Sequence, residues 1–166
     1  MKINTKKLAI LSLLVSVAMI LSYVESLFPV FLAVPGVKLG LSNIATVFAL
    51  YVLGAPCAIC VSVVRVCLSA LLFGNAVGLI YSLFGAAFAL FSMIILKKIR
   101  VFSSIGVSVA GGVFHNLGQV VSAAIMMENA GIVSYFVPLL ISGTISGVLI
   151  GLAAGILVER IEKHIK

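Results

Sequence analysis

Long apolar runs alternate along the chain with short polar, glycine-containing or proline-containing segments. An apolar run of about 20 residues is typical of a helix that crosses a bilayer, where the backbone groups must be hydrogen-bonded within the segment. The pattern predicts an all-α integral membrane protein in which residues 1–166 form one transmembrane domain. We expect a six-transmembrane-helix bundle with helices at about 8–24, 40–53, 57–73, 76–96, 104–127 and 135–158.

The second of these runs is the shortest, because Gly54 and Pro56 end it soon after it begins. A helix over 40–53 reaches across a bilayer only with difficulty, since each residue adds about 1.5 Å. We therefore expect this helix to be tilted, buried among the others or partly irregular.

Composition excludes a soluble enzyme. Hydrophobic residues make up 63% of the chain and charged residues only 9%, whereas a soluble domain carries about 25% charged residues. There is no aspartate, and six helices leave no room for a separate catalytic domain.

The positions of the basic residues behind the net charge of +7 predict the orientation of the chain in the membrane. Nine of the eleven Lys and Arg residues fall in three clusters, at 2–7, 97–100 and 160–166. A six-helix path puts all three clusters on one side, which the positive-inside rule makes cytoplasmic. We predict an N-in/C-in protein of the bacterial plasma membrane and no nucleic-acid partner.

Arg65 lies near the middle of the third predicted helix. An ionisable residue at this depth is costly and is a candidate functional residue. Its guanidinium could bind an anionic or strongly polar ligand, or it could serve structurally by bonding to helix carbonyls.

The fifth predicted helix carries three polar residues within five positions, His115, Asn116 and Gln119. Residues 115 and 119 share a face because they are one turn apart. Together with Arg65 at similar depth they suggest a ligand site, and the alternative is interhelical hydrogen bonding.

The segment 35–43 leads from an outer loop into the second helix, with Lys38 in the loop and Asn43 in the first turn. The free N–H groups of a helix N-terminus suit an anion or a carbonyl group. This segment is either part of a binding site or simply a capped helix entry.

Small residues recur every four positions on two helices. Gly143, Gly147, Gly151 and Gly155 form a stripe on the sixth helix, and Ser12 and Ser16 form a pair on the first. Such residues let helix backbones approach closely, within the bundle or against a partner protein.

Recognisable catalytic chemistry is missing from the sequence. The chain contains no P-loop and no acidic pair for Mg²⁺. Cys57 and Cys60 form a C-x-x-C without further metal ligands, which favours ordinary packing. We predict a protein that is not an enzyme and has no metal or cofactor.

Three segments resemble one family in order: PGVKLGLSNI at 35–44, Arg65 with LLFGN at 71–75, and GGVFHNLGQ at 111–119. The family is the Gx transporters, also labelled heptaprenyl diphosphate synthase component I. It is similar to the substrate-binding S components of energy-coupling factor (ECF) transporters, six-helix proteins that bind a small solute near the outer face. The resemblance covers nearly the whole chain.

This resemblance implies that 35–44 lines a solute site faced by Arg65 and the polar residues of 115–119. It also implies a membrane coupling protein and two ATPases as partners, with Ser12 and Ser16 in the docking position. We therefore expect an S-component-like subunit for uptake of a small anionic or amphipathic solute. The alternative is a non-catalytic accessory subunit of isoprenoid or quinone metabolism, or of flavin-based extracellular electron transfer with a flavinylated partner.

Overall fold

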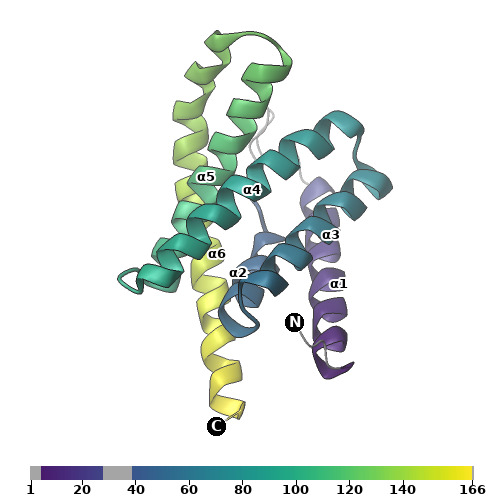
Figure 1. The fold of residues 1–166 in the computed structure, drawn as a ribbon, viewed down its shortest axis with the longest axis vertical. Coiled ribbons are helices and arrows are strands. Elements are labelled where there is room, and N and C mark those ends of the chain that lie inside the picture. The colour runs from purple at the N-terminus through teal and green to yellow at the C-terminus, as the bar shows by residue number, and fades with distance from the viewer. Residues whose placement is uncertain (1–4, 28–38, 166) are drawn as a thin grey trace.

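The computed structural model describes residues 5–27 and 39–165, which form six α-helices and one short 3-10 helix without any strand (Figure 1). The predicted all-helical class is therefore confirmed for this part of the chain. The elements are α1 Thr5–Leu27, α2 Asn43–Val52, α3 Ala55–Phe73, α4 Ala76–Ile99, α5 Ser104–Met126, η1 Ala130–Tyr135 and α6 Phe136–Ile165.

Five helical segments are long and apolar enough to cross a membrane: α1, α3, α4, α5 and the η1–α6 segment. The second predicted span, 40–53, is shorter than expected: α2 has only 10 residues. At 1.5 Å per residue it covers about 15 Å, half of a hydrocarbon core of about 30 Å. Helix α1 is longer than predicted at both ends, and its last turns include Glu25.

The short α2 lies at the centre of the bundle. Its residues 45–50 are all buried, and it packs against α1, α3 and α6. The largest cluster of buried apolar residues includes Ala45, Val47, Ala49 and Leu50 from α2 and draws members from all six helices. A helix enclosed by protein in this way does not need to span the bilayer alone.

Lys97 of α4 holds the end of α2. Its ammonium group donates a hydrogen bond of 2.5 Å to the carbonyl oxygen of Leu50 and lies 4.9 Å from the ring centroid of Tyr51. A cation near a helix C-terminus is favourable because the last carbonyl groups carry a partial negative charge. A lysine counted above as a topology signal thus also fixes the central helix.

Helix α5 packs between α4 and α6, and glycines make both contacts close. A Cβ atom at Gly147 would lie 2.5 Å from the Cα of Val109, and one at Gly151 would lie 2.7 Å from the Cα of Ile105. On the other side of α5, a Cβ at Gly118 would lie 2.6 Å from the carbonyl oxygen of Phe84. The glycine stripe of α6 therefore faces α5 inside the bundle.

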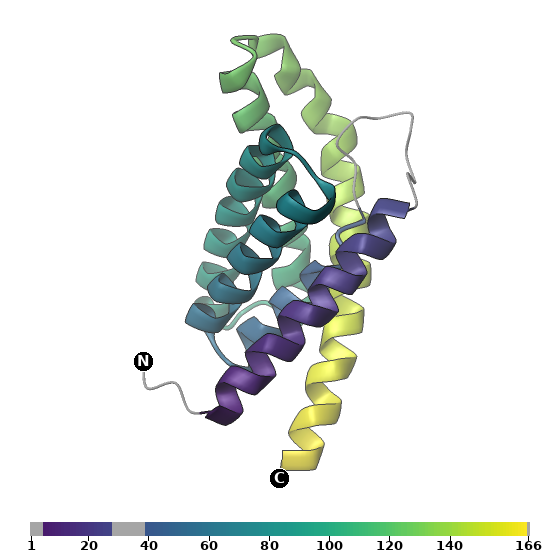
Figure 2. The same ribbon diagram turned by 90° about the vertical axis from the view of Figure 1, so that its right-hand side faces the viewer.

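The start of α1 and the end of α6 lie at the same end of the bundle (Figure 2). The turn between α3 and α4 and the end of α1 lie toward the other end, as does η1. The path of the chain therefore returns to the side from which it starts.

Replacing Gly147 by alanine should destabilise the protein more than the same change at Gly155. The added methyl at 147 meets backbone of α5, which must shift, whereas at 155 it meets only the Ser104 hydroxyl at 3.1 Å. Overpacking of this kind costs about 1–3 kcal/mol. Unfolding of both variants in mixed detergent micelles, followed by circular dichroism, measures the difference. Equal stability of the two variants would contradict the packing described for α5 and α6.

Candidate functional site

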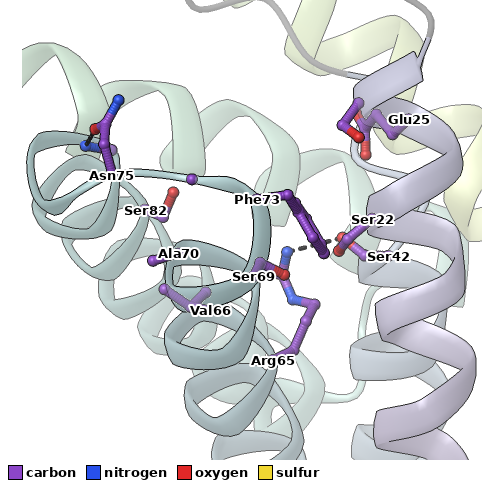
Figure 3. Close-up of a pocket in the computed structure, with 13 residues that line it drawn as sticks. Ser22, Glu25, Ser42, Arg65, Val66, Ser69, Ala70, Phe73, Asn75 and Ser82 are labelled. Atoms are coloured by element: carbon purple, nitrogen blue, oxygen red, sulfur yellow. Dashed lines mark hydrogen bonds between the residues drawn. The ribbon is translucent and has the colours of Figure 1, made fainter.

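Arg65 projects from α3 toward the start of α2 (Figure 3). Its guanidinium donates a 2.8 Å hydrogen bond to the hydroxyl of Ser42 and a 3.4 Å hydrogen bond to the side-chain carbonyl of Asn43. Its Nε is buried and has no hydrogen-bond partner among the described residues. The guanidinium thus bonds to two uncharged side chains and keeps donor capacity for another group.

The chain enters α2 through a turn that leaves the helix N-terminus beside Arg65. Gly40 adopts a φ of +70°, a conformation that residues with a Cβ rarely adopt. The N–H of Asn43 then donates to the carbonyl of Gly40 at 2.8 Å. Ser42 occupies the N-cap position but makes no side-chain cap, since its hydroxyl accepts from Arg65. The partial positive charge of the helix N-terminus therefore adds to that of Arg65.

Glu25 brings the opposite charge to the same region. The predicted first helix stopped at residue 24, whereas the structure places Glu25 half-buried within the last turns of α1. Its carboxylate accepts a 2.5 Å hydrogen bond from the N–H of Gly40 and so fixes the entry to α2. A signal was present in the sequence, because Ser22, Glu25 and Ser26 are spaced three and four residues apart and share one helix face.

Arg65 and Glu25 line a cavity of about 200 Å³ enclosed by α1, α3 and the start of α4. Hydroxyl groups dominate its polar wall, and Figure 3 shows several of them around Arg65. The polar residues that line it are Ser22, Glu25, Ser26, Ser42, Arg65, Ser69, Asn75 and Ser82. We call this space the outer polar cavity.

A smaller cavity of about 50 Å³ shares Glu25, Ser42, Arg65 and Ser82 with the outer polar cavity. It extends from Asn43 of α2 toward α5 and α6, where His115 and Asn116 line it. We call it the inner polar cavity. Because the two spaces share Arg65, a ligand bound to its guanidinium could contact residues of both.

Asn116 also ties α5 to α6. It is only 6% exposed, and its amide nitrogen donates to the carbonyl of Leu139 at 2.6 Å and to the hydroxyl of Ser142 at 3.4 Å. His115 packs its ring against Gly85 of α4, where an added Cβ would lie 2.8 Å from the ring. Both residues therefore hold helices together while they line the inner polar cavity.

The structure brings together four of the six predicted ligand residues, Asn43, Arg65, His115 and Asn116. Gln119 lines a separate, largely apolar cavity. Lys38 lies outside the described residues. Sequence patterns missed the contributions of Glu25, Ser22, Ser69 and Ser82 to the two polar cavities.

The predicted docking residues Ser12 and Ser16 lie on an exposed face of α1. The hydroxyl of Ser16 donates a 2.9 Å hydrogen bond to the backbone carbonyl of Ser12, which lies in the same helix. The large apolar residues Leu13, Val17 and Ile20 of the same helix are also exposed. This face is available to lipid or to a partner.

The arrangement is suited to binding. Within the described ranges no three His, Cys, Asp or Glu side chains gather as a metal site would require. A guanidinium with spare donors, a helix N-terminus and a ring of hydroxyl groups can hold a polar or anionic group, as such donors do elsewhere.

The family model described as heptaprenyl diphosphate synthase component I matches residues 14–157. That range contains every residue that lines the two polar cavities. Comparison with curated proteins and with solved structures gives no significant match.

A cysteine at position 82 should react readily with a small water-soluble thiol reagent. Ser82 lines both polar cavities, whereas Ala89 of the same helix is 5% exposed within the core. A thiol in apolar surroundings reacts slowly because its thiolate is disfavoured. In a background with Cys57, Cys60 and Cys67 replaced by alanine, we expect Ser82→Cys to react at least about tenfold faster than Ala89→Cys. Mass spectrometry gives both rates, and equal rates would show that the polar cavities are closed to water.

Proposed function

The chain belongs to the heptaprenyl diphosphate synthase component I family, and from this premise we propose that it is a membrane-embedded substrate-binding subunit. Its cargo is a small anionic or amphipathic solute, and partner subunits energise the uptake. The chain itself is not the catalyst in this proposal, since it lacks aspartate and only one of its four glutamates, Glu25, lines the polar cavities.

The placement of Arg65 supports this proposal most directly. A guanidinium has five N–H donors, and the hydrogen bonds to Ser42 and Asn43 leave several of them available. A charge inside a membrane protein is costly unless it is paired or faces a polar cavity. An anionic group of the solute in the outer polar cavity would bond to these donors.

The other polar residues then have separate tasks. The N-terminus of α2 adds favourable potential for the anion, and Asn43 contributes a side-chain amide. His115 and Asn116 form the wall at the inner end of the site, where the inner polar cavity has a volume of only about 50 Å³. Lys38 precedes Gly40 by two residues in the sequence, and in this proposal it adds positive charge that favours the anion.

Glu25 restricts which solutes fit. Its carboxylate lines both polar cavities and would repel a purely anionic molecule that filled them. The hydrogen bond from Gly40 offsets part of this effect, because it draws one carboxylate oxygen to the backbone. A solute that carries its negative charge at one end and an uncharged or hydrogen-bond-donating part at the other fits both residues.

We place the start of α1 and the end of α6 on the cytoplasmic side of a bacterial plasma membrane, in line with the positive-inside rule. The outer polar cavity then opens toward the outside, from which the solute enters. An ECF-type coupling protein would dock on the exposed face of α1 around Ser12 and Ser16. The glycine stripe of α6 is already occupied by α5 and is not required for docking.

The second candidate is a non-catalytic accessory subunit. The description of the matching family supports it, because "component I" of a synthase implies a partner subunit. Such a protein would act with an isoprenoid or quinone enzyme, or with a flavinylated electron-transfer protein, and would transport nothing.

Arg65→Met should abolish retention of a co-purified solute, with at least about a tenfold loss, since a buried charge-assisted hydrogen bond is worth about 1.5–3 kcal/mol. Arg100→Met is the matched control, because Arg100 is exposed in the turn after α4. Small molecules extracted from each purified protein are quantified by mass spectrometry. A solute retained equally by both variants would overturn the assignment of Arg65.

Proteins recovered with the chain distinguish the two candidates. Purification from the native host should recover a membrane coupling protein and ATPases if the chain is a transport subunit. Recovery of a prenyl synthase or a flavinylated protein, with no bound solute, would favour the accessory role and contradict the transport proposal.

A further inference from the structure

A third, larger cavity of about 550 Å³ lies between α4, α5, η1 and α6. It shares no lining residue with either polar cavity. The residues that line it are Tyr81, Gln119, Val120, Ala123, Met127, Asn129, Ile132, Tyr135 and Leu139. We call it the apolar cavity, because most of its wall is hydrocarbon.

The apolar cavity begins where the close contacts between α4, α5 and α6 end. Gly118 packs against the backbone of Phe84, and Asn116 is bonded to the carbonyl of Leu139. Beyond this level α4 runs away from α5 and α6, as Figure 1 shows. The η1 segment, between α5 and α6, contributes Ile132 and Tyr135 to the far wall.

Two polar groups that line this cavity have no hydrogen-bond partner among the described residues. Within the described residues, neither the side-chain amide of Gln119 nor the hydroxyl of Tyr81 makes a hydrogen bond, and both residues are half-buried. Asn129 differs, since its side chain already accepts from the N–H of Gly131 at 2.8 Å. Gln119 lies seven residues, about 10 Å, below the end of α5. An amide without a partner at such depth is costly in an apolar medium.

We infer that the apolar cavity binds a compact amphipathic molecule, with an apolar body against Val120, Ala123 and Leu139. One hydroxyl or carbonyl group of that molecule bonds to Gln119 and Tyr81 at the inner end. The volume falls in the range of small-molecule sites, about 300–1,000 Å³. A phospholipid acyl chain fits less well, because its methyl end would meet the amide.

This site is independent of the solute site around Arg65, and its test does not require the proposed function to hold. The probe is a diazirine derivative of 1-octanol, used on the full-length protein in phosphatidylcholine vesicles. After illumination, peptide mapping locates the labelled residues. We expect label on the residues of the apolar cavity, and we expect excess 1-octanol to suppress it.

Ala123→Trp fills the apolar cavity and should lower this labelling at least tenfold. Ala87→Trp, on an exposed position of α4, is the matched control and should retain it. Gln119→Leu keeps the size of the side chain but removes the amide, and should lower the labelling severalfold. Arg65→Met should leave it unchanged.

A second arm uses phosphatidylcholine with a diazirine in one acyl chain, which should label the exposed helix faces without preference for the cavity. If the lipid label instead concentrates in the apolar cavity, and Gln119→Leu does not change that labelling, then the cavity is a lipid crevice and the inference is wrong. Octanol labelling that Ala123→Trp or Gln119→Leu leaves unchanged would overturn it as well.

Discussion

The rest of the structure depends on the burial of one positive charge, that of Arg65, within an apolar helix bundle. A guanidinium at that depth requires polar partners, and the chain supplies them by starting α2 only beside Arg65. Because α2 begins only at Asn43, the side chains of Ser42 and Asn43 and the first N–H groups of the helix lie beside Arg65. The polar cavities follow from that arrangement, since Ser42 and Arg65 line both of them.

Charged residues also fix α2 at both ends. At its start the carboxylate of Glu25 accepts from the N–H of Gly40, and at its end the ammonium of Lys97 donates to the carbonyl of Leu50. Helices α4, α5 and α6 form a closely packed wall beside it, because glycines bring their backbones together. Binding sites need such rigid surroundings, since a ligand gains most from groups that are already held in place. The fold thus combines a glycine-packed half with a polar half.

Much of the fold could be predicted from the sequence, because runs of apolar residues and breakers such as Gly54 mark helices directly. Arg65 was identifiable for the same reason, as a charge inside such a run. Glu25 was missed although it shares a helix face with Ser22 and Ser26, since its role depends on α1 continuing past residue 24. Gln119 shares a helix face with His115, yet the contact of Gly118 with Phe84 separates the two into different cavities. Helix periodicity predicts on which face of a helix a residue lies. Which cavity that face lines depends on where a neighbouring helix crosses it.

The central claim is that the guanidinium of Arg65 is a ligand-binding group. An experimental structure of the protein purified gently from its native membrane tests this most directly. We expect density for a small molecule in the outer polar cavity, with an acidic or carbonyl oxygen within hydrogen-bond distance of Arg65 and with Ser42 and Asn43 close by. A direct ion pair between Arg65 and Glu25, with the helices closed over an empty site, would contradict it and would leave Arg65 a purely structural role.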